Sequence, residues 1–363
     1  MPPRVAIFIL NYNGLRLLGS SLYRSVESAL RVDYQESDVV VIDNASTDGS
    51  FEAVKDRFGN DVRLISLGHN FGYAGGNELG FRKYSAVIGR PDYAIFMNND
   101  FVVTNEGFVK EAIKFMRVRD DVALCQGYHL SYDGIHVDNA GCFLDIFMNP
   151  IHRCNGLSLS ECPALRSYVT YVNGSCFAVN IKTTLKFRNI IFNPRLFAYW
   201  DETELALSLW SHGVKSVFIP KVTGVHLGSK SFGKFSPLHT YLVERNKHIV
   251  RRRYLVKPLN VLSTPSLLRF IFTLPIRPLH GIKGKMITKA FVDSYLGNVP
   301  DDATLGPFIP LIIVPKKFDD FVAHLLPSNS GRFKIAIDKS ATLRVTDDHL
   351  KAISRPFTIL ADF

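Results

Sequence analysis

Short apolar runs and amphipathic segments alternate along the first hundred residues. The runs with the length and content of buried strands are residues 5–10, 39–42, 62–66 and 93–97. The segments with helical spacing of apolar positions or a helix-start signal are residues 15–30, 50–58 and 78–87. This alternation predicts a Rossmann-like α/β fold, in which a mostly parallel sheet with right-handed crossovers is flanked by helices.

The pattern becomes less regular after residue 100. The further helices that we expect are residues 106–117 and 201–213. The further strands that we expect are residues 122–126, 168–180 with an interruption at Gly174 and Ser175, 217–219 and 222–226. Residues 127–165 have no clear period, and we interpret them as strands and loops that cover a site. Alternating apolar positions in residues 331–346 predict a small hairpin.

The chain has 363 residues, of which 47% are hydrophobic and 21% are charged, a balance typical of globular proteins. Its net charge of +10 is concentrated, because 13 Lys and Arg residues and one acid, Glu244, lie between Lys230 and Lys289. This stretch predicts contact with an anionic surface, either lipid headgroups or nucleic acid. No apolar run reaches the roughly 18 residues that span a bilayer. The apolar runs at residues 267–274 and 308–314 suit an interfacial layer instead.

These features divide the chain into three predicted parts. They are an α/β domain at residues 1–228, a basic and partly helical extension at 229–300, and a small C-terminal segment at 301–363. The five cysteines are odd in number and form no CxxC pair, which favours reduced thiols in a cytoplasmic protein over a disulfide framework.

Polar residues follow each of the first four predicted strands. They are Asn11 and Asn13, Asp43 and Asn44, the stretch from Asn70 to Asn77, and Asn98, Asn99 and Asp100. Because parallel strands place their carboxyl ends at the crevice where α/β proteins bind ligands, we expect these side chains to share one site. Asp43 can accept hydrogen bonds from a base or ribose there, and Asp100 can hold a divalent metal against a diphosphate.

Each of these motifs also has a purely local explanation. The residues around Asp43 suit a helix-capping turn, and residues 98–100 suit an Asx turn. The glycines at 72, 75 and 76 either let a phosphate approach the backbone or form a flexible turn. They do not form the GxGxxG fingerprint of dinucleotide-binding proteins. Their common position at strand ends favours the ligand-binding interpretation.

Four residues further along the chain carry possible chemistry. Asp201 and Glu202 stand at the start of a predicted helix, where acids either complement the helix dipole or serve as a general base for a substrate hydroxyl. His226 follows a strand and is either structural or a partner of Asp100 for Mn²⁺. Arg245 belongs either to a solvated helix face or to a phosphate or membrane contact.

Taken in this order, the motifs resemble those of the family 2 glycosyltransferases, inverting enzymes with the GT-A fold, and especially the rhamnosyltransferase-like members. The resemblance covers residues 4–255. The motifs that carry it are residues 11–13, 41–50, 70–77, 98–100 at the DxD position, 173–175, 201–202, 226 and 245–246. Two positions depart from the family pattern: Asn98 replaces the first acid of DxD, and the usual Glu-Asp pair is Asp201-Glu202.

The resemblance implies transfer of a sugar, with inversion, from a nucleotide-diphosphate sugar to a hydroxyl of a glycan or lipid-linked acceptor, as in cell-surface polysaccharide biosynthesis. It implies Mn²⁺ or Mg²⁺ at Asp100 and His226. By register Glu202 is the base, and Asp201 is the alternative. The substrate-binding residues that it implies are Asn11, Asn13, Asp43, Asn44, Asn70, Gly75, Gly76, Asn77, Asn98, Asn99, Gly174, Trp200 and Arg245.

The basic extension then predicts a peripheral contact with an anionic cytoplasmic membrane face, and nucleic acid is not an expected partner. Two other functions fit the sequence. A nucleotidyltransferase that acts on activated sugars would use a similar metal site but would release pyrophosphate. A non-catalytic carbohydrate- or nucleic-acid-binding protein on a glycosyltransferase scaffold is favoured by Asn98.

Overall fold

The structure, a computed structural model, describes residues 2–145, 148–228, 236–254, 272–273, 281–296, 311–314, 334–337 and 358–362. Its strands are β1 (Val5–Asn11), β2 (Ser37–Asp43), β3 (Arg63–Ser66), β4 (Tyr93–Asn98), β5 (Phe101–Val103), β6 (Val122–Leu130), β7 (Val137–Asn139), β8 (Cys142–Asp145), β9 (Pro150–His152), β10 (Ser167–Val169), β11 (Cys176–Asn180), β12 (Lys215–His226), β13 (Leu311–Val314), β14 (Lys334–Ile337) and β15 (Thr358–Asp362). Its helices are α1 (Gly14–Leu18), α2 (Ser21–Leu30), α3 (Ser50–Phe58), α4 (Gly72–Val87), α5 (Phe108–Arg117), α6 (Ile181–Phe187), the 3₁₀ turn η1 (Pro194–Leu196), α7 (Asp201–Trp210), α8 (Pro237–Tyr254) and α11 (Gly281–Leu296).

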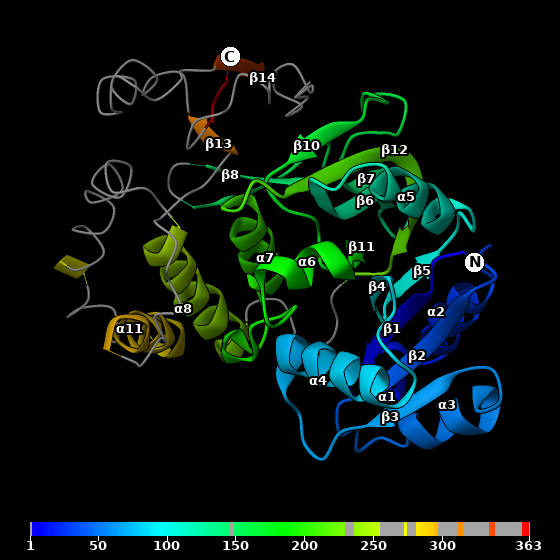
Figure 1. Ribbon diagram of the computed structural model, residues 1–363. Helices are drawn as coiled ribbons and strands as arrows, with labels where there is room; N and C mark the ends of the chain where they lie inside the picture. The colour runs from blue at the N-terminus through cyan, green and yellow to red at the C-terminus, as the bar shows by residue number, and fades with distance from the viewer. Residues whose placement is uncertain are drawn as a thin grey trace.

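Most of these elements surround one twisted sheet (Figure 1). Among the described residues its strand order is β10-β12-β6-β11-β4-β1-β2-β3, with β5 beside β12 and β7 beside β6. β1 pairs in parallel with β2 and β4, β2 with β3, and β6 with β12. β11 runs antiparallel between β4 and β6. The predicted α/β class, a mostly parallel sheet flanked by helices, is confirmed.

Alternate residues of the central strands face two separate cores. Val5, Ile7 and Ile9 of β1 pack in one core with α2, α3 and α5. Ala6 and Phe8 pack in the other core with α4, α6, α7 and α8. The strands are apolar on both faces because helices cover both sides of the sheet. This layering leaves the carboxyl ends of β1, β2 and β4 as the edge where polar side chains gather.

Several predicted elements have different boundaries in the structure. Residues 15–30 form two helices, because Gly19 ends α1 in a left-handed conformation. The helix predicted from residue 78 begins at Gly72, because the side chains of Asn44 and Asn70 accept hydrogen bonds from the first amides of that turn (3.0 and 2.8 Å). The single strand predicted at residues 168–180 is two strands, β10 and β11, which pair with different neighbours.

The last predicted strands are also joined. Residues 215–226 form one strand, β12, whose register shifts near Phe218 and Val222 account for the expected break. A second sheet has the order β14-β15-β13-β8-β9 within the described segments. The strand β14 lies where the first arm of the hairpin was predicted, but it pairs in parallel with β15. The second arm, near residue 345, lies outside the described residues, and the three-part division of the chain stays a prediction.

The expectation that all five cysteines are reduced is wrong for two of them. Cys154 and Cys162 form a disulfide, whereas Cys125, Cys142 and Cys176 are free and buried. The two bonded residues are eight positions apart and the loop between them folds back on itself, which the odd count of cysteines could not reveal. Separately, no helix in the described part of the chain is long and apolar enough to cross a membrane.

Candidate active site

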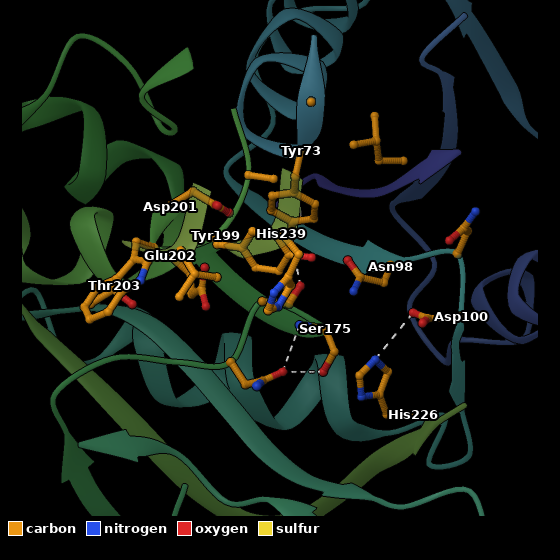
Figure 2. Close-up of a pocket in the computed structure, with 18 of the residues that line it drawn as sticks. Tyr73, Asn98, Asp100, Ser175, Tyr199, Asp201, Glu202, Thr203, His226 and His239 are labelled. Atoms are coloured by element: carbon orange, nitrogen blue, oxygen red, sulfur yellow. Dashed lines mark hydrogen bonds and ion pairs between the residues drawn. The ribbon is translucent and has the colours of Figure 1, made fainter. Parts of the chain in front are cut away.

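A cavity of about 530 Å³ opens at the carboxyl ends of β1 and β4 and at the start of α7. Figure 2 shows Asp100 and His226 on one side of this cavity and Asp201 and Glu202 on the opposite side. The cavity therefore brings together two pairs of titratable groups, one of which joins residues from distant parts of the sequence. Its size suits a small-molecule substrate.

His226 links two carboxylates. Its Nδ1 lies 3.0 Å from Asp138 Oδ2, and its Nε2 lies 3.5 Å from Asp100 Oδ1. Asp138 belongs to β7, His226 ends β12, and Asp100 follows β4, so three strands of the sheet meet here. Burial by itself would lower the pKa of His226, but hydrogen bonds and charge from Asp100 and Asp138 outweigh burial and raise this pKa to about 10. The site therefore favours a positive charge.

The free atoms of this group fit a divalent cation. Asp100 Oδ1 and His226 Nε2 are both buried, and neither has a hydrogen-bond partner other than the 3.5 Å contact that they make with each other. Buried polar atoms without partners are rare and call for an occupant. A carboxylate oxygen and an imidazole nitrogen are suitable ligands for Mn²⁺. Within the described residues no cluster of three or more acidic, His or Cys side chains is arranged to hold a metal alone, so substrate and water would supply the remaining ligands.

Asp201 and Glu202 form a buried carboxyl pair at the first turn of α7. Burial, and then the charge of Glu202, raises the pKa of Asp201 well above its ordinary value. Burial raises the pKa of Glu202 to about 7, although hydrogen bonds from its own backbone amide and from Asp201 act in the opposite direction. Acids that only complement a helix dipole would have lowered pKa values. The hydrogen bond between the two carboxyls places the shared proton on Asp201, so Glu202, whose pKa is about 7, is the member of the pair that can ionise near neutral pH and then accept a proton.

The predicted residues at the ends of β1 and β2 form a buried network. The Asn11 amide donates to Asp43 Oδ1 (3.1 Å) and Ser50 Oγ (2.9 Å), and Asn99 Nδ2 donates to Asn11 Oδ1 (3.0 Å). Asn13 Oδ1 accepts from the amide of residue 47 (2.8 Å). Asn11, Asn13 and Asp43 thus bind the surrounding turns to one another and do not line the cavity, whereas Asn44, Asn98 and Asn99 do.

The glycine-rich stretch is the first half of α4, not an open loop. Asn70 and Gly72 line the cavity, whereas Gly75, Gly76 and Asn77 face the protein interior. A Cβ on Gly72 would lie only 2.3 Å from the carbonyl oxygen of Phe197. The glycine at this position therefore makes room for the backbone that precedes the carboxyl pair.

Of the remaining predicted residues, Gly174 and Trp200 line the cavity and Arg245 does not. The oxygen of Gly174 accepts a hydrogen bond from the Tyr73 hydroxyl (2.9 Å), and a Cβ at Gly174 would stand 3.5 Å from Glu202 Oε2. Arg245 donates instead to the backbone oxygens of residues 195 and 196, both at 2.9 Å.

The cavity residues that the sequence did not predict include five with polar or aromatic side chains, Tyr73, Asp138, His152, Tyr199 and His239. Tyr199 and His239 lie edge to face with ring centroids 4.8 Å apart, and Figure 2 shows both rings near the middle of the cavity. No local pattern marks these residues, because they come from separate loops, strands and helices. Only Tyr73 lay inside a motif that the sequence had already singled out.

Part of the chain matches a known protein family. Residues 6–156 match the family described as Glycosyl transferase family 2. The chain is also similar to the UDP-Glc:alpha-D-GlcNAc-diphosphoundecaprenol beta-1,3-glucosyltransferase WfaP of Escherichia coli, at 26% identity over 240 residues, which is 64% of this chain and 82% of WfaP.

Two solved structures show a weaker similarity. S. aureus TarS 1–349 in complex with UDP-GlcNAc is 15% identical and covers 68% of this chain, with a TM-score of 0.47; this chain spans about two thirds (66%) of that TarS chain. The mannosyltransferase PcManGT from Pyrobaculum calidifontis, in complex with GDP-Man and Mn2+, is 13% identical over 82% of this chain and 88% of its own, with a TM-score of 0.47.

Proposed function

We propose that this chain, which belongs to glycosyl transferase family 2 and has the GT-A fold, transfers a sugar from a nucleotide-diphosphate sugar to a hydroxyl of an acceptor, with inversion at the anomeric carbon. One observation carries the proposal. A carboxylate–imidazole pair with unpartnered atoms and a carboxyl pair with raised pKa values face the same cavity. The first pair suits the diphosphate of a donor, and the second suits the hydroxyl of an acceptor.

The donor would occupy the side of the cavity that the strand ends form. Asn44, Asn70 and Asn99 line that side, and Asp43 lies directly behind it. We infer that Asp43 acts on the nucleotide through the turn that it holds, because its two oxygens already accept from Asn11 (3.1 Å) and from the amide of residue 46 (3.0 Å). We propose substrate contacts for the other predicted residues that line the cavity.

Asp100 Oδ1 and His226 Nε2 are the atoms that would hold Mn²⁺ or Mg²⁺. A divalent cation there would neutralise the charge that builds up on the departing nucleoside diphosphate. Asp138 would hold the imidazole so that Nε2 points at Asp100. The absence of the first DxD carboxylate at Asn98 is then offset by His226 as the second protein ligand.

The carboxyl pair would act on the acceptor. Glu202 accepts the proton of the acceptor hydroxyl while the hydroxyl oxygen forms a bond to the anomeric carbon and the bond from that carbon to the diphosphate breaks. A single displacement of this kind inverts the anomeric carbon. The neutral Asp201 carboxyl donates a hydrogen bond to Glu202, which favours the ionised form of Glu202 at neutral pH. Glu202 is therefore our preferred base.

WfaP supplies the most specific guide to the substrates. Its name describes a UDP-Glc donor and a diphosphoundecaprenol-linked GlcNAc acceptor. We propose a lipid-linked acceptor of this class and a UDP-hexose donor for the present chain. The motifs alone do not identify the sugar, and their resemblance to the rhamnosyltransferase-like members makes a nucleotide-linked rhamnose the alternative donor.

A lipid-linked acceptor requires the protein to work at a membrane surface. The exposed face of α11 carries Ile282, Lys285, Lys289 and Val292 at helical spacing, which suits an anionic interface. We propose that this face gives a peripheral contact with the cytoplasmic side of the membrane. Lys285→Glu with Lys289→Glu should abolish sedimentation with anionic liposomes at low salt, whereas Lys55→Glu with Lys114→Glu, which changes the net charge equally, should not. Equal losses would overturn this contact.

The test of the main proposal is nucleoside-diphosphate release with Mn²⁺ across a panel of nucleotide sugars, with a diphosphopolyprenol-linked GlcNAc as acceptor and Asp100→Ala as control. We expect release from one donor, loss in the variant, and a product of inverted anomeric configuration by NMR. Release of inorganic pyrophosphate would identify a nucleotidyltransferase instead. Donor binding without turnover, unchanged in Asp100→Ala and Glu202→Ala, would identify a non-catalytic binding protein.

A further inference from the structure

The segment that leads into the carboxyl pair has an unusual backbone. Phe197, Tyr199 and Trp200 have φ angles of 65°, 68° and 67°, and Asp201 begins α7 immediately afterwards. Backbone conformations with positive φ are unfavourable for residues other than glycine, and they persist only where the surroundings enforce them. The direction in which Asp201 and Glu202 enter the cavity therefore depends on whatever holds this segment.

One buried side chain holds three carbonyl groups of this segment. Asn246 of α8 is completely buried, and its Nδ2 donates to the carbonyl oxygens of Leu196 (2.9 Å), Ala198 (2.9 Å) and Tyr199 (2.8 Å). Its Oδ1 accepts from Arg245 Nε at 2.9 Å. Both polar atoms of the Asn246 side chain thus form hydrogen bonds, Nδ2 with the segment and Oδ1 with Arg245.

The same segment has partners on its other carbonyls. Arg245 donates to the oxygens of residues 195 and 196, and the amide of Ala74 in α4 donates to the oxygen of Phe197 (3.0 Å). Every carbonyl from residue 195 to residue 199 therefore accepts a hydrogen bond from outside its own stretch. The backbone has one well-satisfied arrangement, and rotation of a peptide group would leave a buried carbonyl without a donor.

We propose that Asn246 is a positioning residue of the carboxyl pair: it holds the 196–200 segment in its left-handed conformation and so aims Asp201 and Glu202 into the cavity. The inference rests on the proposed function, in which Glu202 is the base. It assigns Asn246 no contact with substrate, because Asn246 does not line the cavity. It also gives the Arg245-Asn246 motif a physical role other than phosphate binding.

The structure offers a matched control on the same pair of helices. The Tyr254 hydroxyl of α8 donates to Glu204 Oε1 of α7 at 2.8 Å, so Tyr254→Phe removes one buried hydrogen bond between these helices without touching the 196–200 segment. Asn246→Ala removes the side-chain amide that donates to the carbonyl oxygens of residues 196, 198 and 199. Arg245→Lys is a milder variant that retains the charge and loses the forked contacts with residues 195 and 196.

Two readouts test the proposal. In Asn246→Ala, amides of residues 197–202 should exchange with deuterium about tenfold faster, with little change in residues 205–210. Its kcat should fall about 100-fold while the KM for the donor stays within about threefold, because displacement of a base costs turnover and not donor binding. Tyr254→Phe should lower the unfolding temperature and keep kcat within about twofold.

A kcat for folded Asn246→Ala within the range of Tyr254→Phe would overturn the proposal, and so would a raised donor KM at unchanged kcat. If Asn246→Ala does not fold, Arg245→Lys decides by the same criteria, with a smaller expected loss of about tenfold. A parent protein without glycosyl transfer would instead refute the proposed function. In that case the exchange rates alone would decide whether Asn246 holds the segment.

Discussion

The Asp138 carboxylate accepts a hydrogen bond from Nδ1 of His226 at 3.0 Å, and this contact turns the opposite ring nitrogen toward Asp100. The two residues are 88 positions apart in the sequence. A carboxylate that orients a histidine in this way raises the basicity of the imidazole toward a metal. The relationship makes Asp138, which no motif contains, a determinant of cation binding in the proposed enzyme.

Asp138→Asn should weaken Mn²⁺ binding by about 10–100-fold, because the amide no longer stabilises the orientation and charge of the imidazole. Isothermal titration with Mn²⁺ measures this without any turnover. Asp133 offers a matched control, since it forms an exposed pair with His136 at 2.6 Å and does not line the cavity. Equal Mn²⁺ affinity in the parent, Asp138→Asn and Asp133→Asn would refute this role.

The carboxyl pair predicts an asymmetry between two amide substitutions. Glu202→Gln should lower kcat at least about 1,000-fold, because it removes the base. Asp201→Asn should cost about tenfold or less, because the amide still donates a hydrogen bond to Glu202 as the protonated carboxyl does. Steady-state kinetics at saturating donor and acceptor measure both, with circular dichroism as the check on folding. The reverse order of losses would make Asp201 the base.

The raised pKa of Glu202 predicts the pH dependence of turnover. Its pKa is about 7, so Glu202 is protonated and inactive as a base at lower pH and ionised at higher pH. The kcat should therefore rise with pH through about 7 and fall nearly tenfold per pH unit below about 6. Donor affinity measured over the same range is the control. A flat kcat profile between about pH 5.5 and 8 would contradict the assignment.

The close contact between α4 and β2 predicts an effect on stability. A Cβ on Gly80 would lie 2.1 Å from Cδ1 and 2.6 Å from Cγ1 of Ile42. Gly80→Ala should lower the free energy of unfolding by about 1–3 kcal/mol, even though alanine favours a helix, because the core must shift to admit the methyl group. Val87→Ala, at a position that is 82% exposed on the same helix, is the control for urea denaturation. An unchanged or increased free energy of unfolding for Gly80→Ala would show that Ile42 moves aside freely.

The strands and the polar strand ends were predictable because their signals are local. A run such as residues 5–10 is apolar on both faces because helices cover both sides of the sheet, and the structure confirms it as β1. The turns after β1, β2 and β4 place Asn44, Asn98, Asn99 and Asp100 at one cavity, as their common position at strand ends predicted. Asn11 and Asp43 came from the same signal but support the turns from behind.

Two predictions failed because they depended on how loops fold around particular side chains. The start of α4 at Gly72 depends on hydrogen bonds that the amides of Phe71 and Gly72 donate to the side chains of Asn44 and Asn70. The disulfide between Cys154 and Cys162 depends on how their loop folds. Neither spacing nor composition reports such contacts, because each is made by groups that the rest of the fold brings together.

The sequence alone determines the succession of strands along the chain, the polar residues at the strand ends and the acidic pair at the start of α7. These features are local, because hydrophobic period and turn chemistry act over a few residues. The partnership of Asp138 with His226, the contacts of Asn246 with the 196–200 segment and the raised pKa of Glu202 arise only in the folded protein. Hydrogen-bond geometry and desolvation depend on which distant surfaces pack together, and that packing turns a set of polar residues into a site.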